Sequence, residues 1–222
     1  CSSDLFVAMD ENSKSQPVTP YVPVTDEEKR VQQAAISRID LRNAIEDEMI
    51  AQTYSSNSTA PEITHRFLAK PTDINWGGNV HGGTAMEWID EAGAACTMEW
   101  SGERTVAVYA GGIRFYRPIH IGDLIEVEAR LTRTDTRSLH TSIHVRSGDP
   151  RGGRGSLQDA IHASVTYLGT DIDGNPLPAR QFTPVTEEDE RLWEHTQTLK
   201  DLRAQYEPEP LVRLPDPAQR TD

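Results

Sequence analysis

The chain has 222 residues, with 22 basic and 35 acidic side chains and a net charge of −13. This balance argues against binding to nucleic acid or to an anionic membrane through bulk charge, so an anionic ligand would need locally placed arginines. No apolar stretch approaches the roughly 20 residues of a membrane span and no signal-peptide pattern opens the chain, which predicts a cytoplasmic protein. Two cysteines, Cys1 and Cys96, are too few for a disulfide framework or a zinc site, and we expect Cys96 to pack as a small apolar residue.

The beginning of the chain is similar to a later part of the same chain. Residues 6–30 align without gaps on residues 167–191. Each copy has the pattern of a strand end, a turn at an aspartate, a proline-rich crossing and a helix capped by Thr25 or Thr186. We therefore expect residues 1–50 to be the closing strand and C-terminal helix of a first domain that is largely missing. The alternative is an unrelated N-terminal arm.

Two further segments lack the periodicity of helices and strands. Residues 51–61 are polar and rich in serine, threonine and asparagine, which indicates a linker. Residues 206–222 are charged and rich in proline, and we expect them to be extended or disordered. The interval between them, 62–205, is then one complete domain.

This second domain has the pattern of one helix and five strands. The helix is expected from about Gly83 to Trp100, and the strands within 62–69, 105–118, 123–134, 138–147 and 158–170. In the third strand Ile125, Val127, Ala129 and Leu131 alternate with charged residues, as in a half-buried antiparallel strand. A helix against five antiparallel strands predicts an α+β, two-layer domain.

The helix combines an apolar stripe with an acidic residue at its margin. The stripe consists of Met86, Ile89, Gly93, Cys96 and Trp100, and Asp90 lies beside it. The small residues at 92–95 are expected to let a neighbouring backbone approach closely.

Several residues around the start of this helix are suited to catalysis. A carboxylate half enclosed by apolar surface is expensive to keep ionised, and general bases use this property, so Asp90 is a candidate base. The amides of Gly82 and Gly83 lie at the positive end of the helix and can stabilise an oxyanion. Asn79 is placed to orient a water molecule or a carbonyl group. The alternative for Asp90 is a structural aspartate on the helix surface.

The stretch "NVHGGTAMEWIDEAGA" resembles the signature of hotdog-fold acyl-CoA thioesterases, in particular the broad-specificity acyl-CoA hydrolases, some of which carry two hotdog domains in tandem. The resemblance continues through residues 115–123 and 171–191. It implies a five-stranded antiparallel sheet wrapped around a long central helix. It also implies self-association, in which domains pair so that their sheets join and the pairs gather into trimers.

The resemblance further implies the hydrolysis of acyl-CoA thioesters without a cofactor. Asn79 and Asp90 stand at the family's catalytic positions, and the pair of domains supplies them jointly. Asp90 would activate a water molecule or attack the thioester itself, while the amide of Gly82 or Gly83 holds the oxyanion.

Coenzyme A carries three phosphates, so an acidic chain must offer local cations to bind it. The candidates are Arg114, Arg117, Arg137 with Ser138 beside it, and Arg151 with Arg154 in the glycine-rich loop. No metal site is expected, since His140 and His144 on one strand lie roughly 13 Å apart.

Two other functions remain compatible with the sequence. A hotdog hydratase would need an aspartate and histidine pair, and no histidine follows Asp90 until His120. A non-catalytic acyl-CoA sensor would bind the substrate without releasing its thiol.

Overall fold

The computed structural model describes residues 8, 10, 11 and 14–205. It divides into two compact units, with the boundary between Asp40 and Leu41, inside helix α1 (Asp26–Ile50). The second unit therefore begins earlier than the expected domain start at residue 62. The expected tail and most of the expected first strand lie outside the described residues. No helix in the described part is long and apolar enough to cross a membrane.

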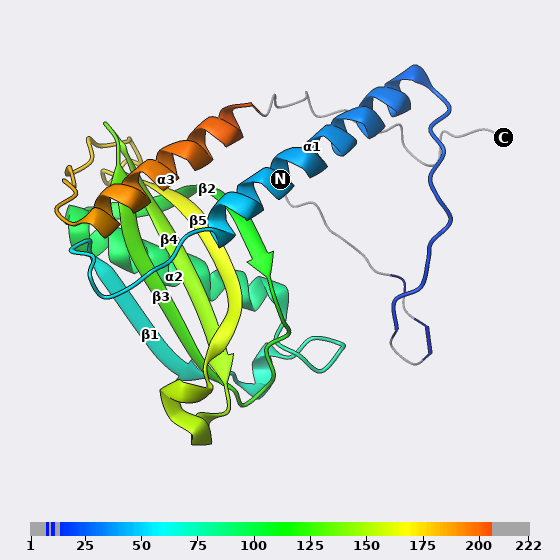
Figure 1. The fold of residues 1–222 in the computed structure, drawn as a ribbon, viewed down its shortest axis with the longest axis horizontal. Coiled ribbons are helices and arrows are strands. Elements are labelled where there is room, and N and C mark those ends of the chain that lie inside the picture. The colour runs from blue at the N-terminus through cyan, green and yellow to red at the C-terminus, as the bar shows by residue number, and fades with distance from the viewer. Residues whose placement is uncertain (1–7, 9, 12–13, 206–222) are drawn as a thin grey trace. The chain divides into compact units, whose positions relative to one another are not determined.

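The second unit contains a five-stranded antiparallel sheet wrapped around one helix (Figure 1). The strands follow the order β1-β3-β4-β5-β2, and helix α2 (Gly82–Ser101) contacts all five. Helix α3 (Glu187–Ala204) contacts β3 from the other face. Two short 3₁₀ helices, Pro71–Asp73 and Pro150–Ser156, lie in the connections. The strands are β1 (Glu62–Leu68), β2 (Arg104–Phe115), β3 (Leu124–Thr134), β4 (Ser138–Gly148) and β5 (Gln158–Thr170). This architecture confirms the predicted α+β hotdog fold.

Strand β3 shows why the sheet needs cover on both faces. Its alternating residues Ile125, Val127, Ala129 and Leu131 are fully buried, as predicted. The charged residues between them were expected to face solvent, but Glu126 and Arg130 are buried as well. The prediction of a half-buried strand is therefore wrong. Arg130 is covered by its ion pair with Glu188 of α3, and Glu126 by arginine side chains such as Arg66 and Arg146 of the neighbouring strands.

Helix α2 follows the predicted stripe with one exception. Ile89, Gly93 and Cys96 are buried, whereas Met86 is 45% exposed. What approaches Gly93 is the ring of Tyr167 and not a backbone: a Cβ at Gly93 would lie 2.2 Å from the Tyr167 hydroxyl oxygen. Gly93 on α2 therefore makes room for the side chain of Tyr167, which projects from β5.

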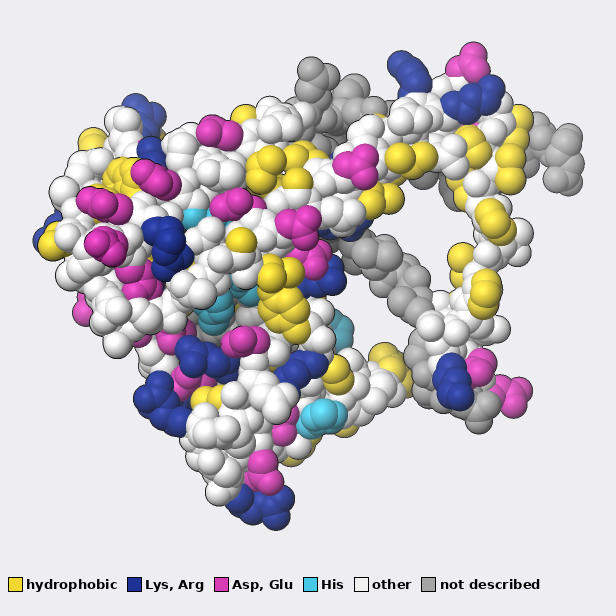
Figure 2. Space-filling view, in the orientation of Figure 1, with side chains coloured by type: hydrophobic (Ala, Val, Ile, Leu, Met, Phe, Trp, Pro, Cys, Tyr) yellow, Lys and Arg dark blue, Asp and Glu magenta, His cyan; other side chains and the backbone are white. Residues whose placement is uncertain are grey.

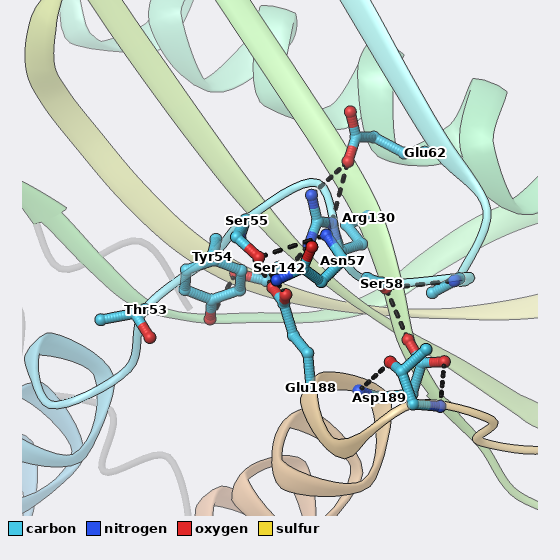
Figure 3. A network of polar contacts seen from close by, with 12 residues as sticks. Thr53, Tyr54, Ser55, Asn57, Ser58, Glu62, Arg130, Ser142, Glu188 and Asp189 are labelled. Carbon is cyan, nitrogen blue, oxygen red and sulfur yellow. Dashed lines mark hydrogen bonds and ion pairs between the residues drawn. The ribbon is translucent and has the colours of Figure 1, made fainter.

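The outer face of the sheet carries a network of ion pairs (Figure 3). Arg130 donates from Nε to Glu62 at 2.9 Å and from Nη1 to Glu188 at 3.0 Å. Ser55 donates its backbone N–H to Glu188 at 2.7 Å, and Thr59 donates its own to Asp189 at 3.0 Å. The predicted linker is thus fixed to the first turn of α3. On the face seen in Figure 2 acidic and basic side chains are mixed, without a large basic patch.

The two copies of the internal repeat form the same turn. The backbone N–H of Asp10 donates to the carbonyl of Lys14 at 2.8 Å, and that of Asp171 donates to Asn175 at 3.0 Å. In return the N–H of Lys14 and that of Asn175 each donate to the aspartate Oδ1 at 2.8 Å.

The helices that follow the turns also begin alike. Thr25 Oγ1 accepts from the N–H of Glu28 and Thr186 Oγ1 from that of Asp189, both at 3.1 Å. Both threonines are the predicted N-caps, and each is part of a capping box.

Buried histidines on the outer face of β4 and β5 predict sensitivity to acid. The rings of His144 and His162 stack at 4.0 Å, and burial lowers the pKa of His162 to about 3. Burial also lowers the pKa of His140 to about 4, against the opposing effect of Asp135. The unfolded chain takes up protons on these rings below about pH 6.5, whereas the folded protein does not. We therefore expect the free energy of unfolding to fall steadily as the pH decreases from 6.5 towards 4.

This expectation can be separated from the titration of carboxylates by the choice of pH. Urea unfolding at pH 7, 6 and 5 isolates the histidines, since model carboxylates remain largely ionised above about pH 5. The variant His162→Gln is expected to flatten this slope. The same slope in the variant and in the parent chain would contradict the account.

Candidate active site

The loop before α2 is organised by Asn75. Its Oδ1 accepts from the N–H of Gly77 at 2.8 Å and from that of Asn79 at 3.1 Å. Its Nδ2 lies 3.4 Å from the carbonyl oxygen of Val80, which is a long and weak hydrogen bond. Gly78 has a φ of 82°, a conformation that glycine adopts without strain. The side-chain oxygen of Asn75 is therefore occupied, whereas its amide group makes one weak hydrogen bond and keeps a second hydrogen available.

The N-terminus of α2 offers one amide instead of the predicted two. The ring of His81 caps the helix by accepting the N–H of Gly83 on Nδ1 at 3.0 Å. Gly83 is thus not a free oxyanion donor, which corrects the prediction for this residue. No described residue accepts a hydrogen bond from the amide of Gly82. The amide of Gly82 is therefore available for a ligand at the positive end of the helix.

A pocket of about 390 Å³ opens beside this amide. Asn79 and Gly82, two of the predicted catalytic residues, contribute to its wall. Its apolar wall comes from the start of α2 and the end of β2. The lining residues are Asn75, Asn79, Val80, Gly82, Ala85, Phe115, Tyr116, Arg117, Pro118 and Ile119. A pocket that combines polar donors with apolar side chains suits a substrate with a carbonyl group and a hydrocarbon chain.

Asp90 does not line this pocket. It lies eight residues beyond Gly82 on α2, a rise of about 12 Å along the helix axis. The side chain of Asp90 is exposed. The prediction that apolar side chains half enclose this carboxylate is therefore wrong within one chain. Asp90 lies on a solvent-exposed margin of α2, where the hydroxyl of Tyr167, which projects from β5, donates to its Oδ1 at 3.2 Å. Within one chain, Asp90 therefore lies apart from the pocket that Asn79 and Gly82 line.

The predicted cations lie at two different ends of the sheet. Arg114 forms an ion pair with Glu46 of α1. Arg117 lines the pocket and donates to Ser147 and Gln158, so its guanidinium pins the ends of β4 and β5 together.

Arg137 and Ser138 lie at the far end of β4. Ser138 is nine residues before Ser147 on this strand, a separation of about 30 Å. Its hydroxyl contacts His140 at 3.0 Å and Asp135 at 3.3 Å, while Arg137 is exposed. One chain therefore does not bring these two residues to the pocket.

Two residues at the site are absent from the sequence-based set. Asn75 carried a signal, since an asparagine two residues before a glycine pair favours a turn held by its side chain. No sequence pattern pointed to Tyr167, because its contact with Asp90 joins positions that are 77 residues apart. Among the described residues, no three histidine, cysteine, aspartate or glutamate side chains gather as a metal site would require.

Comparison with known proteins supports one family. The thioesterase superfamily model matches residues 77–153, which include the second half of the loop, α2 and strands β2 to β4. The acyl-CoA thioester hydrolase YciA of Salmonella typhimurium is 32% identical over 130 residues, which cover 57% of this chain and 96% of that protein. The mouse cytosolic acyl coenzyme A thioester hydrolase is 31% identical over 159 residues, which cover 68% of this chain and 39% of that protein.

A solved structure agrees with the fold. A hexameric acyl-CoA thioesterase superimposes with a TM-score of 0.61 at 27% identity, over 66% of this chain and 92% of that one. The hotdog architecture, the sequence match to the loop and helix α2, and a relative matched along almost its whole length lead to one conclusion. The chain belongs to the thioesterase superfamily and is a hydrolase of thioester bonds.

Proposed function

We propose that this protein hydrolyses acyl-CoA to a free fatty acid and coenzyme A, in the cytoplasm. The observation that carries the proposal is the pocket beside α2, where the unpaired amide of Gly82 and two asparagines meet an apolar wall. The names of the relatives YciA and the cytosolic acyl coenzyme A thioester hydrolase support acyl-CoA as the substrate class. The acyl chain would lie along the apolar wall, with the thioester carbonyl at the polar end.

In the proposed reaction, the Gly82 amide donates to the thioester oxygen while the asparagine loop orients the carbonyl or the water. Asp90 takes a proton from that water as its oxygen attacks the carbonyl carbon. The carbon–sulfur bond then breaks, and the thiolate of coenzyme A leaves and is protonated. The other route is attack by Asp90 itself, followed by hydrolysis of the acyl-aspartyl anhydride. Single turnover in oxygen-18 water tests the covalent route, because label in Asp90 arises only when water attacks the Cγ carbon of Asp90 in the anhydride.

The exposed position of Asp90 requires a second copy of the domain. Strand β2 is an edge of the sheet, and Val106 and Val108 on it are 47% and 52% exposed. A second β2 joined to this edge would cover these side chains and continue the sheet. We infer that such a pair brings Asp90 of one copy to the pocket of the other. Each copy would then supply part of two sites.

The two asparagines of the loop can be tested separately. Asn75→Asp keeps the oxygen that accepts from Gly77 and Asn79 but removes the amide donor. Asn79→Ala removes a side chain that lines the pocket and leaves the loop contacts in place. We expect each variant to lower kcat by about 10²-fold, the effect of losing one oxyanion donor. Normal turnover in either variant would remove that asparagine from the mechanism.

The coenzyme A phosphates require cations, and we propose Arg114 and Arg117 from one copy, with Arg137 and Ser138 from another. The separation of about 30 Å along β4 is the reason for assigning them to different copies. Arg137→Glu is expected to raise KM more than it lowers kcat, as measured by initial rates over a range of acyl-CoA concentrations. An unchanged KM would exclude Arg137 from binding.

The assay that tests the whole proposal follows thiol release with a chromogenic reagent, across acyl-CoA chain lengths. Release of free coenzyme A is the expected result. Binding without release from any chain length would identify a sensor instead. Loss of the enoyl absorbance of an unsaturated acyl-CoA, without thiol release, would identify a hydratase.

We also propose that the protein contains another hotdog domain before this one. The first unit would pack on the sheet of that domain, as residues 171–204 pack on the sheet described here. The identical turns and caps of the two copies support this proposal. Phe182 is 6% exposed, whereas its counterpart Tyr21 is 61% exposed. The intact mass of the protein from its natural source tests the tandem arrangement. A mass well above 24.7 kDa is expected, and a mass equal to it would contradict a preceding domain.

A further inference from the structure

Tyr167 stands between the sheet and the candidate catalytic aspartate. It lies on β5, is fully buried and points its hydroxyl at α2. The hydroxyl oxygen is 3.2 Å from the backbone oxygen of Asp90 and 3.2 Å from its Oδ1. This is the contact that joins the exposed carboxylate to the rigid interior of the domain.

Helix α2 is shaped to admit this hydroxyl. A Cβ at position 93 would lie 2.2 Å from the hydroxyl oxygen of Tyr167 and 2.8 Å from Cδ1 of Ile143. No side chain larger than that of glycine fits there without displacing the tyrosine. Gly93 therefore permits Tyr167 to reach Asp90, one helical turn earlier on the same helix.

The direction of the hydrogen bond follows from the protonation of the tyrosine. Burial, and to a lesser degree the nearby Asp90 carboxylate, raises the pKa of Tyr167 well above its usual value. The hydroxyl thus keeps its proton and donates it, while the aspartate oxygens accept. One carboxylate oxygen is engaged in this way, and the other, Oδ2, has no partner among the described residues.

We propose that Tyr167 is a positioning residue for thioester hydrolysis, which fixes the rotamer of Asp90 so that Oδ2 faces the pocket of the paired copy. The inference rests on the proposed function of Asp90. An exposed aspartate that is free to rotate would spend much of its time away from the attacking water, and fixing its orientation removes this loss. Tyr167 does not line the pocket, so its hydroxyl is not expected to contribute to substrate binding.

The variant Tyr167→Phe tests this role, with Tyr54→Phe as the matched control. Tyr54 is half-buried, and its hydroxyl accepts a hydrogen bond from Ser142 of β4 at 2.9 Å and makes no contact with Asp90. We expect Tyr167→Phe to lower kcat by about 10-fold with KM unchanged within about 2-fold. Tyr54→Phe is expected to leave both constants unchanged. Thermal unfolding of both variants reports any general loss of stability.

Introducing Tyr167→Phe into the Asp90→Glu variant tests whether its effect depends on the contact with Asp90. In Asp90→Glu the longer side chain places its carboxylate beyond the tyrosine, so adding Tyr167→Phe is expected to change kcat by less than about 2-fold. The same 10-fold loss in both backgrounds, or equal losses in the two tyrosine variants, would overturn the proposal. Full activity of Asp90→Asn would instead overturn the proposed catalytic role of Asp90, on which the positioning role of Tyr167 rests. An inactive Asp90→Asn beside an unaffected Tyr167→Phe would refute only the positioning role.

Discussion

Replacement of Asp90 by asparagine is expected to lower kcat for acyl-CoA hydrolysis by about 10³-fold, within the range for loss of a general base. The amide cannot take the proton from the attacking water, nor can it act as a nucleophile. The exchange conserves the shape of the side chain, and its oxygen can still accept from Tyr167. Thiol release at saturating substrate measures the effect.

The neighbouring residue provides the control for this variant. Glu91 is also an exposed acid on α2, and Glu91→Gln changes the net charge by the same amount. We expect Glu91→Gln to keep full activity and both variants to unfold at the temperature of the parent chain. Near-normal hydrolysis by a folded Asp90→Asn protein would remove Asp90 from the mechanism.

The largest expected loss of stability comes from Arg130→Met. Arg130 is 4% exposed and binds Glu62 and Glu188, so its removal leaves Glu188 buried without its cation. Breaking a buried ion pair in this way costs about 3 to 5 kcal/mol. Glu188 also accepts from Ser55, so the loss of its cation is expected to weaken the contact between α3 and residues 51–61 (Figure 3). Guanidinium chloride unfolding measures the loss of unfolding free energy relative to the parent chain. The slope of this free energy against denaturant concentration is expected to stay unchanged.

An exposed ion pair serves as the comparison for Arg130. The side chain of Arg151 is 90% exposed and pairs with Asp149 in the loop after β4. Screening by water makes such a pair worth little, and Arg151→Met is expected to leave the unfolding midpoint unchanged. Equal midpoints for the two variants would show that the network on the outer face does not stabilise the domain.

Much of the fold could be predicted because it depends on local patterns. The alternation from Ile125 to Leu131 identified a strand, and the threonines before α1 and α3 identified the two helix starts. The glycine pair at the start of α2 pointed to two candidate oxyanion donors, Gly82 and Gly83, and the structure leaves the amide of Gly82 available. Each of these features is determined within about ten residues of sequence.

The features that could not be predicted depend on distant partners. The capping of Gly83 by His81 depends on the orientation of a ring, which spacing alone does not give. The exposure of Asp90 depends on which margin of α2 faces the sheet. The burial of Arg130 depends on Glu188, which lies 58 residues further along the chain. Sequence patterns predicted the elements, and the structure was needed to show which surfaces they cover.

We propose that each active site combines residues of two copies of the domain. A mixing experiment tests this sharing most directly. One chain carries Asp90→Asn, and the other carries Asn75→Asp together with Asn79→Ala. Each is expected to be inactive alone. After joint refolding in equal amounts, half of the pairs are mixed and each mixed pair holds one intact site of two, so about a quarter of the parent activity should return. A mixture that remains as inactive as its components would contradict a shared site.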